Sequence, residues 1–177
     1  MENIHLGDLK SGMPGISAIE GANLYDNCVV ALHNRGHQMP VILVAKGLKT
    51  TNYSLIWEDT YNQQLERTYN DLQSVTERAA VGISVILAIK ETEYTIIERS
   101  RKGTGFDYML GDKADPLFTP KARLEISGIM KETEGNTISS RFLQKTSQVK
   151  KSDCTSLPAY ISIVEFSTPK VLFDIKK

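Results

Sequence analysis

The chain has few of the features that assign a protein to a class at once. Its 177 residues include only two cysteines, Cys28 and Cys154, which are too few and too far apart for a disulfide framework or a cysteine-based zinc site. No run approaches the roughly 18 apolar residues of a membrane span, and the N-terminus lacks the basic-then-apolar order of a signal peptide. These absences favour a cytoplasmic protein that does not contact a membrane.

The chain also lacks an excess of charge of one sign, since 21 Lys and Arg residues balance 21 Asp and Glu residues. No global field would hold the protein on a polyanion, so any contact with nucleic acid must come from a local basic patch. Histidine is scarce as well. His33 and His37 have the spacing of two zinc ligands on a helix, but no carboxylate lies between them, so surface or capping roles are favoured.

The composition is that of an ordinary globular protein, with 41% apolar residues over about one domain's length. We expect a single domain over residues 1–177. Within it, residues 1–58 would form an N-terminal helix and hairpin extension, and residues 59–177 would form the core. The glycine-containing segment 1–17 is expected to be disordered or loosely attached.

Hydrophobic periodicity predicts the order of the elements. Helices are expected over residues 18–35, ended by Gly36, over 59–90, and from an Asn136 cap to about residue 150. Strands are expected over residues 40–47 and 53–57 as a hairpin, and over 94–99, 106–110, 122–129, 159–166 and 170–175. Cys28 lies in the first helix and is expected in the core. The fold class that follows is α/β (α+β), with a mixed central sheet flanked by helices.

The two strands between Gly105 and Gly128 have a register that can be tested by arithmetic. If their turn centres at residue 116, opposed residues sum to 232, which pairs Phe106 with Ile126, Tyr108 with Leu124 and Leu110 with Ala122. All six apolar residues then share one face of the sheet.

On the other face the same register places Asp107 opposite Glu125, with Arg123 and Ser127 on either side of Glu125 along its strand. Two directly opposed carboxylates repel each other unless a cation lies between them. Mg²⁺ (or Mn²⁺) fits, because it binds one or two carboxylates together with waters and substrate phosphates. The alternative is a polar surface on which Arg123 neutralises both acids.

The order of these motifs, Glu77 in a helix, then YTIIERSRKGTGFDYMLG, then ARLEISGI, resembles the core of the PD-(D/E)XK nucleases. Holliday-junction-resolvase-like and restriction-endonuclease-like members are the most similar. The resemblance implies a restriction-endonuclease-like fold and metal-dependent cleavage of DNA. It also implies that Glu77 is the helix acid, Asp107 the metal-binding aspartate and Glu125 the first residue of Glu-x-Lys.

Ser127 departs from the pattern, because it stands where the family has lysine. Some members of the family supply this lysine from the following helix. Lys145 is the candidate here, since Arg141, Lys145 and Gln148 have the i, i+4, i+7 spacing of one helical face. In this interpretation Lys145 stabilises charge on the phosphate and Gln148 orients water or backbone.

Arg101 and Lys102, with Arg99 before them and Arg141 on the later helix, would form a basic patch for nucleic acid. The simpler interpretation of these residues is a solvated surface. A homodimer is expected by analogy with small nucleases that cut two strands.

Two other functions stay open. The chain could be a non-catalytic nuclease-fold subunit that binds DNA or a protein partner in a larger assembly, which Ser127 favours. It could instead be a small-molecule sensor with an apolar pocket bounded by residues 18–58. The aromatic residues Tyr53, Trp57, Tyr61 and Tyr69 are assigned to packing.

Overall fold

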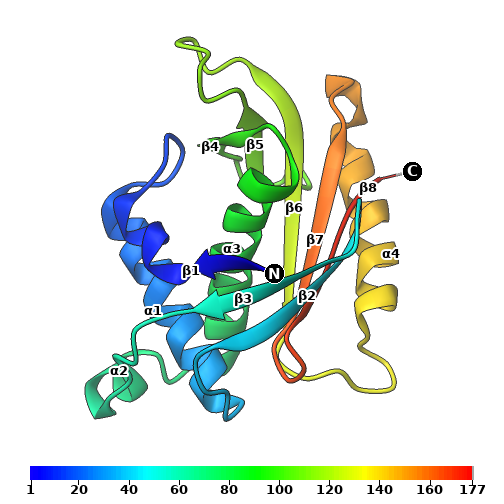
Figure 1. Cartoon of the computed structure of the whole chain (residues 1–177). Helices are drawn as coiled ribbons and strands as arrows, with labels where there is room; N and C mark the ends of the chain where they lie inside the picture. Colours follow the sequence, from blue (N-terminus) through cyan, green and yellow to red (C-terminus); the bar gives the residue numbers. More distant parts are fainter. Residues whose placement is uncertain (177) are drawn as a thin grey trace.

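An eight-stranded mixed sheet runs through the protein (Figure 1). The computed structural model describes residues 1–176. The strands are β1 (Glu2–His5), β2 (Val41–Gly47), β3 (Thr51–Ile56), β4 (Thr95–Arg99), β5 (Tyr108–Gly111), β6 (Pro120–Ile129), β7 (Ala159–Glu165) and β8 (Lys170–Ile175). Their order across the sheet is β1-β3-β2-β8-β7-β6-β5-β4. The pairs β1–β3, β2–β8 and β6–β7 are parallel and the others antiparallel, which confirms the predicted mixed α/β class.

Different helices cover the two faces of the sheet. Helices α1 (Ala18–Asn34) and α3 (Leu72–Glu91) lie on one side, and α4 (Ile138–Gln148) lies on the other (Figure 1). Leu124 and Ile126 of β6 point into the large core shared with α1 and α3. On the opposite face, Ile161 of β7 and Phe142 of α4 belong to a second, smaller core.

The first helix confirms its prediction closely. Ser17 caps α1 by accepting a hydrogen bond from the Glu20 amide at 3.2 Å. After the helix, Gly36 adopts a φ of 72°, a conformation that glycine reaches without the steric cost of a Cβ atom. Cys28 is fully buried between α1 and α3, as expected.

The single helix predicted over residues 59–90 is wrong in its first half. The structure has two helices there, a short α2 (Gln63–Thr68) with no buried residue and the long α3. Asp71 makes the break, because its carboxylate accepts a hydrogen bond from the Gln73 amide at 3.0 Å and starts α3 anew. Tyr69 before this break and Val75 after it both pack in the core, so the apolar spacing continues where the helix does not.

Helix α3 is apolar because it is enclosed by protein. Among residues 1–176 it is the one helix with the length and hydropathy of a membrane span, but 61% of that window is buried. Its neighbours are α1 on one side and β6 on the other. Burial between these elements accounts for the apolar residues around its circumference.

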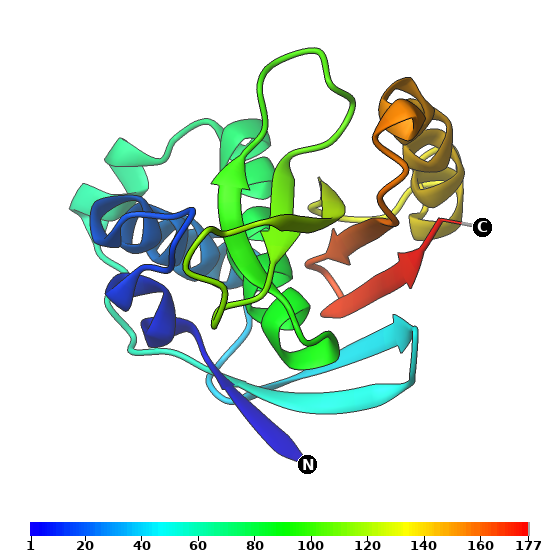
Figure 2. The ribbon, with the colours of Figure 1, turned by 90° about the horizontal axis from the view of Figure 1, so that it is seen from above.

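The prediction that residues 1–17 are disordered or loosely attached is wrong. β1 pairs in parallel with β3, and a 3₁₀ helix η1 (Leu6–Ser11) packs against α1. Ile4, Leu6 and Leu9 are fully buried. Figure 2 shows the N-terminal strand beside β3 at one edge of the sheet. The segment was missed because its pairing partner lies about 50 residues away and its apolar residues follow no regular period.

The predicted register of β5 and β6 is confirmed where the strands pair, with Tyr108 opposite Leu124 and Leu110 opposite Ala122. The predicted pair of Phe106 with Ile126 is wrong. The pairing of β5 with β6 begins only at Tyr108, because the Asp107 carboxylate, and not a backbone carbonyl, accepts the hydrogen bond of the Ile126 amide at 2.8 Å. Phe106 then packs in the second core, on the opposite side of the sheet from Tyr108.

Helix α4 begins one residue later than predicted, since Thr137 and not Asn136 is its N-cap. Thr137 and Ser140 form a reciprocal capping box. The helix ends at Gln148, and a 3₁₀ helix η2 (Val149–Thr155) continues the chain into β7. This crossover places α4 over the face of β6 that carries Glu125.

Candidate functional site

A cluster of polar side chains lies at the middle of β6, beneath α4. Glu125 is only 1% exposed. The Lys145 ammonium donates to Glu125 Oε1 at 2.5 Å, and Gln148 Nε2 donates to the same oxygen at 2.9 Å. Lys145 also donates to Gln148 Oε1 at 3.1 Å. The structure therefore brings together the glutamate of one predicted motif and two residues of the predicted helical face.

The second oxygen of Glu125 has no such support. Within residues 1–176, Glu125 Oε2 is buried and has no hydrogen-bond partner. Burial, followed by the negative charge of neighbouring Asp107, raises the pKa of Glu125 to about 7, although Lys145 opposes this change. Burial also raises the pKa of Asp107 above its usual range. When both carboxyl groups are ionised, their protein partners therefore neutralise their charge incompletely, and the pair favours binding a proton.

The backbone fixes the position of Asp107 at the entrance to β5. Its amide donates to the Leu124 carbonyl at 2.9 Å, and its carbonyl accepts from Ser100 at 2.8 Å. Gly105, two residues earlier, has a φ of 86°, and a Cβ there would lie 2.6 Å from the Gln148 carbonyl oxygen. The glycine bend therefore lets the Asp107 strand approach the C-terminal end of α4 closely.

Arg141 contacts Ser127, the residue two positions after Glu125 on β6. Its guanidinium donates to Ser127 Oγ at 3.3 Å and to Asn136 Oδ1 at 2.6 Å. Arg141, Lys145 and Gln148 thus face β6 together, one contacting Ser127 and two contacting Glu125. Asn136, which the sequence indicated as a helix cap, instead orients Arg141.

The alternative in which Arg123 neutralises both acids is wrong. Arg123 is 3% exposed and donates to the Val149 and Leu157 carbonyls, to Ser152 Oγ and to Asp153. All of these partners lie in η2 and the loop that follows it. Arg123 therefore anchors η2 and forms no hydrogen bond with Asp107 or Glu125.

A cavity of about 560 Å³ opens beside the cluster, between α3 and α4 and along the part of β6 that β5 leaves unpaired. Asp107, Ser127, Arg141 and Lys145 line it. Glu77 also lines this cavity from α3, but it is exposed and its carboxylate accepts a hydrogen bond from Gln73 at 3.4 Å. Glu77 therefore faces the cavity without joining the hydrogen-bonded cluster.

Arg78 is a cavity residue that the sequence did not reveal. It forms an ion pair with Glu20 at 2.7 Å and donates to Asn23 at 2.6 Å. Both partners belong to α1, more than 50 residues earlier. No local spacing in the sequence signals such a pair.

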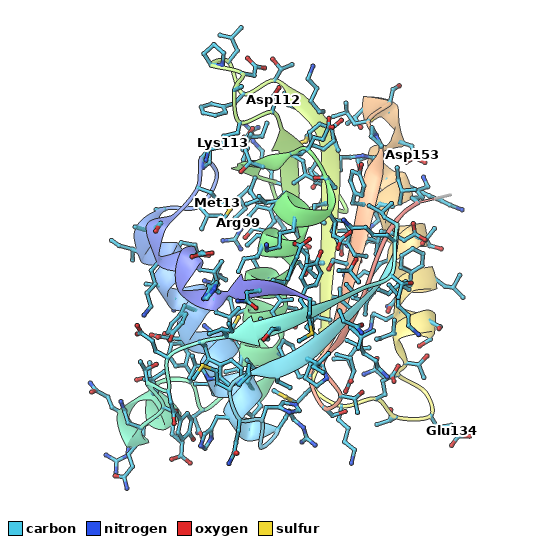
Figure 3. The ribbon with its side chains drawn as sticks, viewed as in Figure 1. Met13, Arg99, Asp112, Lys113, Glu134 and Asp153 are labelled. Carbon is cyan, nitrogen blue, oxygen red and sulfur yellow. The ribbon has the colours of Figure 1, made fainter. Side chains whose placement is uncertain are left out.

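A second hollow, of about 510 Å³, lies on the other side of Asp107. Arg101 and Lys102, both exposed, line it together with Arg99, Glu125 and Gln148. The loop that follows β4 projects from the sheet edge between α4 and the helices of the other face (Figure 2). Arg99 lies beside the loop that carries Met13, whereas Asp153 lies across the sheet (Figure 3).

A third hollow, of about 510 Å³, is lined by Val29, His33, His37 and Trp57 among others. It lies in the region expected for a small-molecule sensor. His37 Nε2 is 2.7 Å from the Phe166 carbonyl oxygen, and the His33 ring stacks on Tyr61 with centroids 3.4 Å apart. These contacts occupy both histidines in packing. Tyr53 and Trp57 are buried, in agreement with the assignment of these aromatic residues to packing.

Comparisons with protein-family models, with curated proteins and with solved structures found no match to this chain. Among residues 1–176, no group of three or more His, Cys, Asp or Glu side chains is placed to hold a metal ion. Any metal site at the cluster would therefore depend on two carboxylates, Asp107 and Glu125, completed by water and substrate.

Proposed function

We propose that the protein is a metal-dependent DNA phosphodiesterase, similar in its cleavage site to the PD-(D/E)XK endonucleases. The observation that carries this proposal is the contact of Lys145 with Glu125 beside Asp107. The helix after the Glu strand supplies a cation to the acid pair, in agreement with the prediction that Lys145 takes the part of the lysine for which Ser127 stands. The order of the elements from α3 to β7 also agrees with the resemblance.

Asp107 and Glu125 fit a divalent cation. Both are oxygen ligands, their pKa values are raised, and Glu125 Oε2 has no partner in the described chain. Mg²⁺ or Mn²⁺ is the cation that suits two carboxylates with the remaining ligands from water and phosphate. Such an ion would supply a Lewis acid and lower the pKa of a bound water.

The side chains of α4 would act on the phosphate. The Lys145 ammonium would stabilise negative charge that develops on the phosphate oxygens, because it lies in a largely buried site where charge interactions are strong. Gln148 holds Glu125 in place and would orient water or backbone. Arg141 would bind a neighbouring phosphate from its place beside Ser127, and Glu77 would contact water on the opposite cavity wall.

Cleavage of plasmid and branched DNA with Mg²⁺ or Mn²⁺ tests this function. Asp107→Asn, Glu125→Gln and Lys145→Ala should each lower the rate by roughly 100-fold or more. Lys121→Ala is the matched control, since Lys121 is exposed on β6 outside the cluster, and it should cut like the wild type. Mg²⁺ should also raise the Tm of the wild type but not of Glu125→Gln. Equal cutting by the wild type and the Asp107 and Glu125 variants would overturn the site.

The second candidate is a non-catalytic nuclease-fold subunit that binds DNA or a protein partner. Ser127 favours it, because Arg141 already occupies the region where the family's lysine would act. A wild-type protein that binds DNA, cuts none and shows no Mg²⁺-dependent change in Tm would support this candidate. A cytoplasmic location and a homodimer remain predictions from the sequence.

A further inference from the structure

Arg99 stands between the two hollows that flank the acid pair. It ends β4, is exposed, and lines both the 560 Å³ cavity and the 510 Å³ hollow. Asp107 is the other residue that lines both. The two hollows therefore adjoin at Asp107, and the Arg99 guanidinium lies beside this junction.

Three cations of this region have no counter-ion in the protein. Among residues 1–176, the side chains of Arg99, Arg101 and Lys102 form no ion pair or hydrogen bond, whereas Arg78 is held by Glu20. On the far side of Asp107, Arg141 and Lys145 line the other cavity. The acid pair thus has cations on both sides. A site that accepts only the end of a polynucleotide strand would need cations on only one side of the acid pair.

We propose that the substrate strand continues on both sides of the cleaved bond, running from the α3–α4 cavity to the Ser100–Gly105 loop, and that Arg99 binds a phosphate between them. This inference rests on the proposed function and names its substrate class, a polynucleotide strand bound at an internal position. The phosphate at the acid pair would have one neighbour near Arg141 and another near Arg101 and Lys102. Arg99 lies where the strand passes from one hollow to the other.

The salt dependence of binding measures these contacts without cleavage. A fluorescein-labelled single-stranded oligonucleotide is titrated with the full-length protein in EDTA at several salt concentrations. Each phosphate contact contributes roughly 0.7 to the slope of log affinity against log salt for a single strand. Arg99→Ala should weaken binding by about tenfold and reduce this slope by about one contact. Arg99→Lys should keep most of the slope, because the charge remains.

Variants on each side test the two-sided path. Arg141→Ala on one side and Arg101→Ala with Lys102→Ala on the other should each reduce the slope, whereas Lys121→Ala should not. If only the variants on one side of Asp107 reduced the slope, the proposed two-sided path of the strand would be overturned. Wild-type affinity and slope in Arg99→Ala would overturn the role of Arg99 while leaving the proposed function intact. A wild-type protein that binds the branched DNA of the cleavage assay but not the oligonucleotide would overturn the path alone. Only a wild-type protein that binds neither DNA would overturn the proposed function.

Discussion

Two buried glutamates on neighbouring parallel strands have opposite environments. Glu125 on β6 and Glu165 at the end of β7 are each 1% exposed. Burial raises the pKa of both, but hydrogen bonds from Ser167 and Thr168 to Glu165 outweigh it and leave that pKa lowered. The pKa of Glu125 is raised to about 7 instead. Burial of a carboxylate therefore does not distinguish the two glutamates, whereas the completeness of their hydrogen bonding does.

Arg123 extends the comparison along β6 itself. It lies two residues before Glu125, on the same face, and donates hydrogen bonds from all three of its nitrogens. Arg123 holds the 3₁₀ helix η2 in place. Glu165 holds the turn between β7 and β8 in place. Glu125 has an oxygen without a partner and faces a cavity residue, Asp107, of the same charge.

The largest effect on stability is expected at Arg123. Arg123→Met should lower the free energy of unfolding by about 3–5 kcal/mol, because the Val149 and Leu157 carbonyls and Ser152 lose their buried donors. Urea denaturation measures this change, with Lys121→Ala as the exposed control. A loss below about 1 kcal/mol would contradict the structural role assigned to Arg123.

Glu165→Gln should cost about 2–3 kcal/mol at pH 7, since the amide cannot accept all the hydrogen bonds from Ser167 and Thr168. The lowered pKa of Glu165 means that its carboxylate stabilises the fold above pH 4.5, its ordinary value, and loses this effect as pH falls through the native pKa. Denaturation at pH 7 and at acid pH should therefore show the variant and wild type converging at acid pH. If the difference in free energy of unfolding between the variant and the wild type stayed the same at both pH values, this prediction would be contradicted.

Glu125→Gln should have the opposite pH dependence. A raised pKa stabilises the fold fully below pH 4.5, and this stabilisation is lost as pH rises to about 7. Relative to the wild type, the variant should gain roughly 2–3 kcal/mol of stability between pH 4.5 and pH 8. Paired denaturation curves at the two pH values measure this gain. If the gain were absent, the pKa of Glu125 would not be raised, and the conclusion that its charge is incompletely neutralised would be refuted.

The smallest effect is expected where a charge pair is open to water. Lys176 forms an ion pair with Asp153, whose side chain is 47% exposed. Lys176→Ala should change the free energy of unfolding by less than about 1 kcal/mol, because solvent screens the pair. The same urea measurement checks it. A loss as large as that of Arg123→Met would show that Asp153, and not the carbonyl groups, anchors η2.

Local patterns predicted much of the site, because its residues are close in the sequence. The alternation of β5 and β6 fixed which residues oppose each other, as Tyr108 and Leu124 show. The i, i+4, i+7 spacing placed Arg141, Lys145 and Gln148 on one face, and all three do contact β6. These relations depend only on the geometry of a hairpin and a helix.

The errors arose where distant residues or side chains competed with a local pattern. Asp71 starts a new helix inside an unbroken apolar stripe, and Asp107 takes the amide that would have paired Phe106 with Ile126. β1 forms only because β3 offers it an edge. Periodicity reports which residues are buried, but it does not report which backbone groups find side-chain partners.

The position of β8 in the sheet has a consequence for synthesis. It is the last strand of residues 1–176, yet it lies between β2 and β7 and joins the two halves of the sheet. While the chain is still on the ribosome, the β2–β3 hairpin has no partner on its inner edge until residues 170–175 have emerged. A protein truncated before Lys170 would expose that edge permanently, and we expect it to aggregate by edge-to-edge pairing.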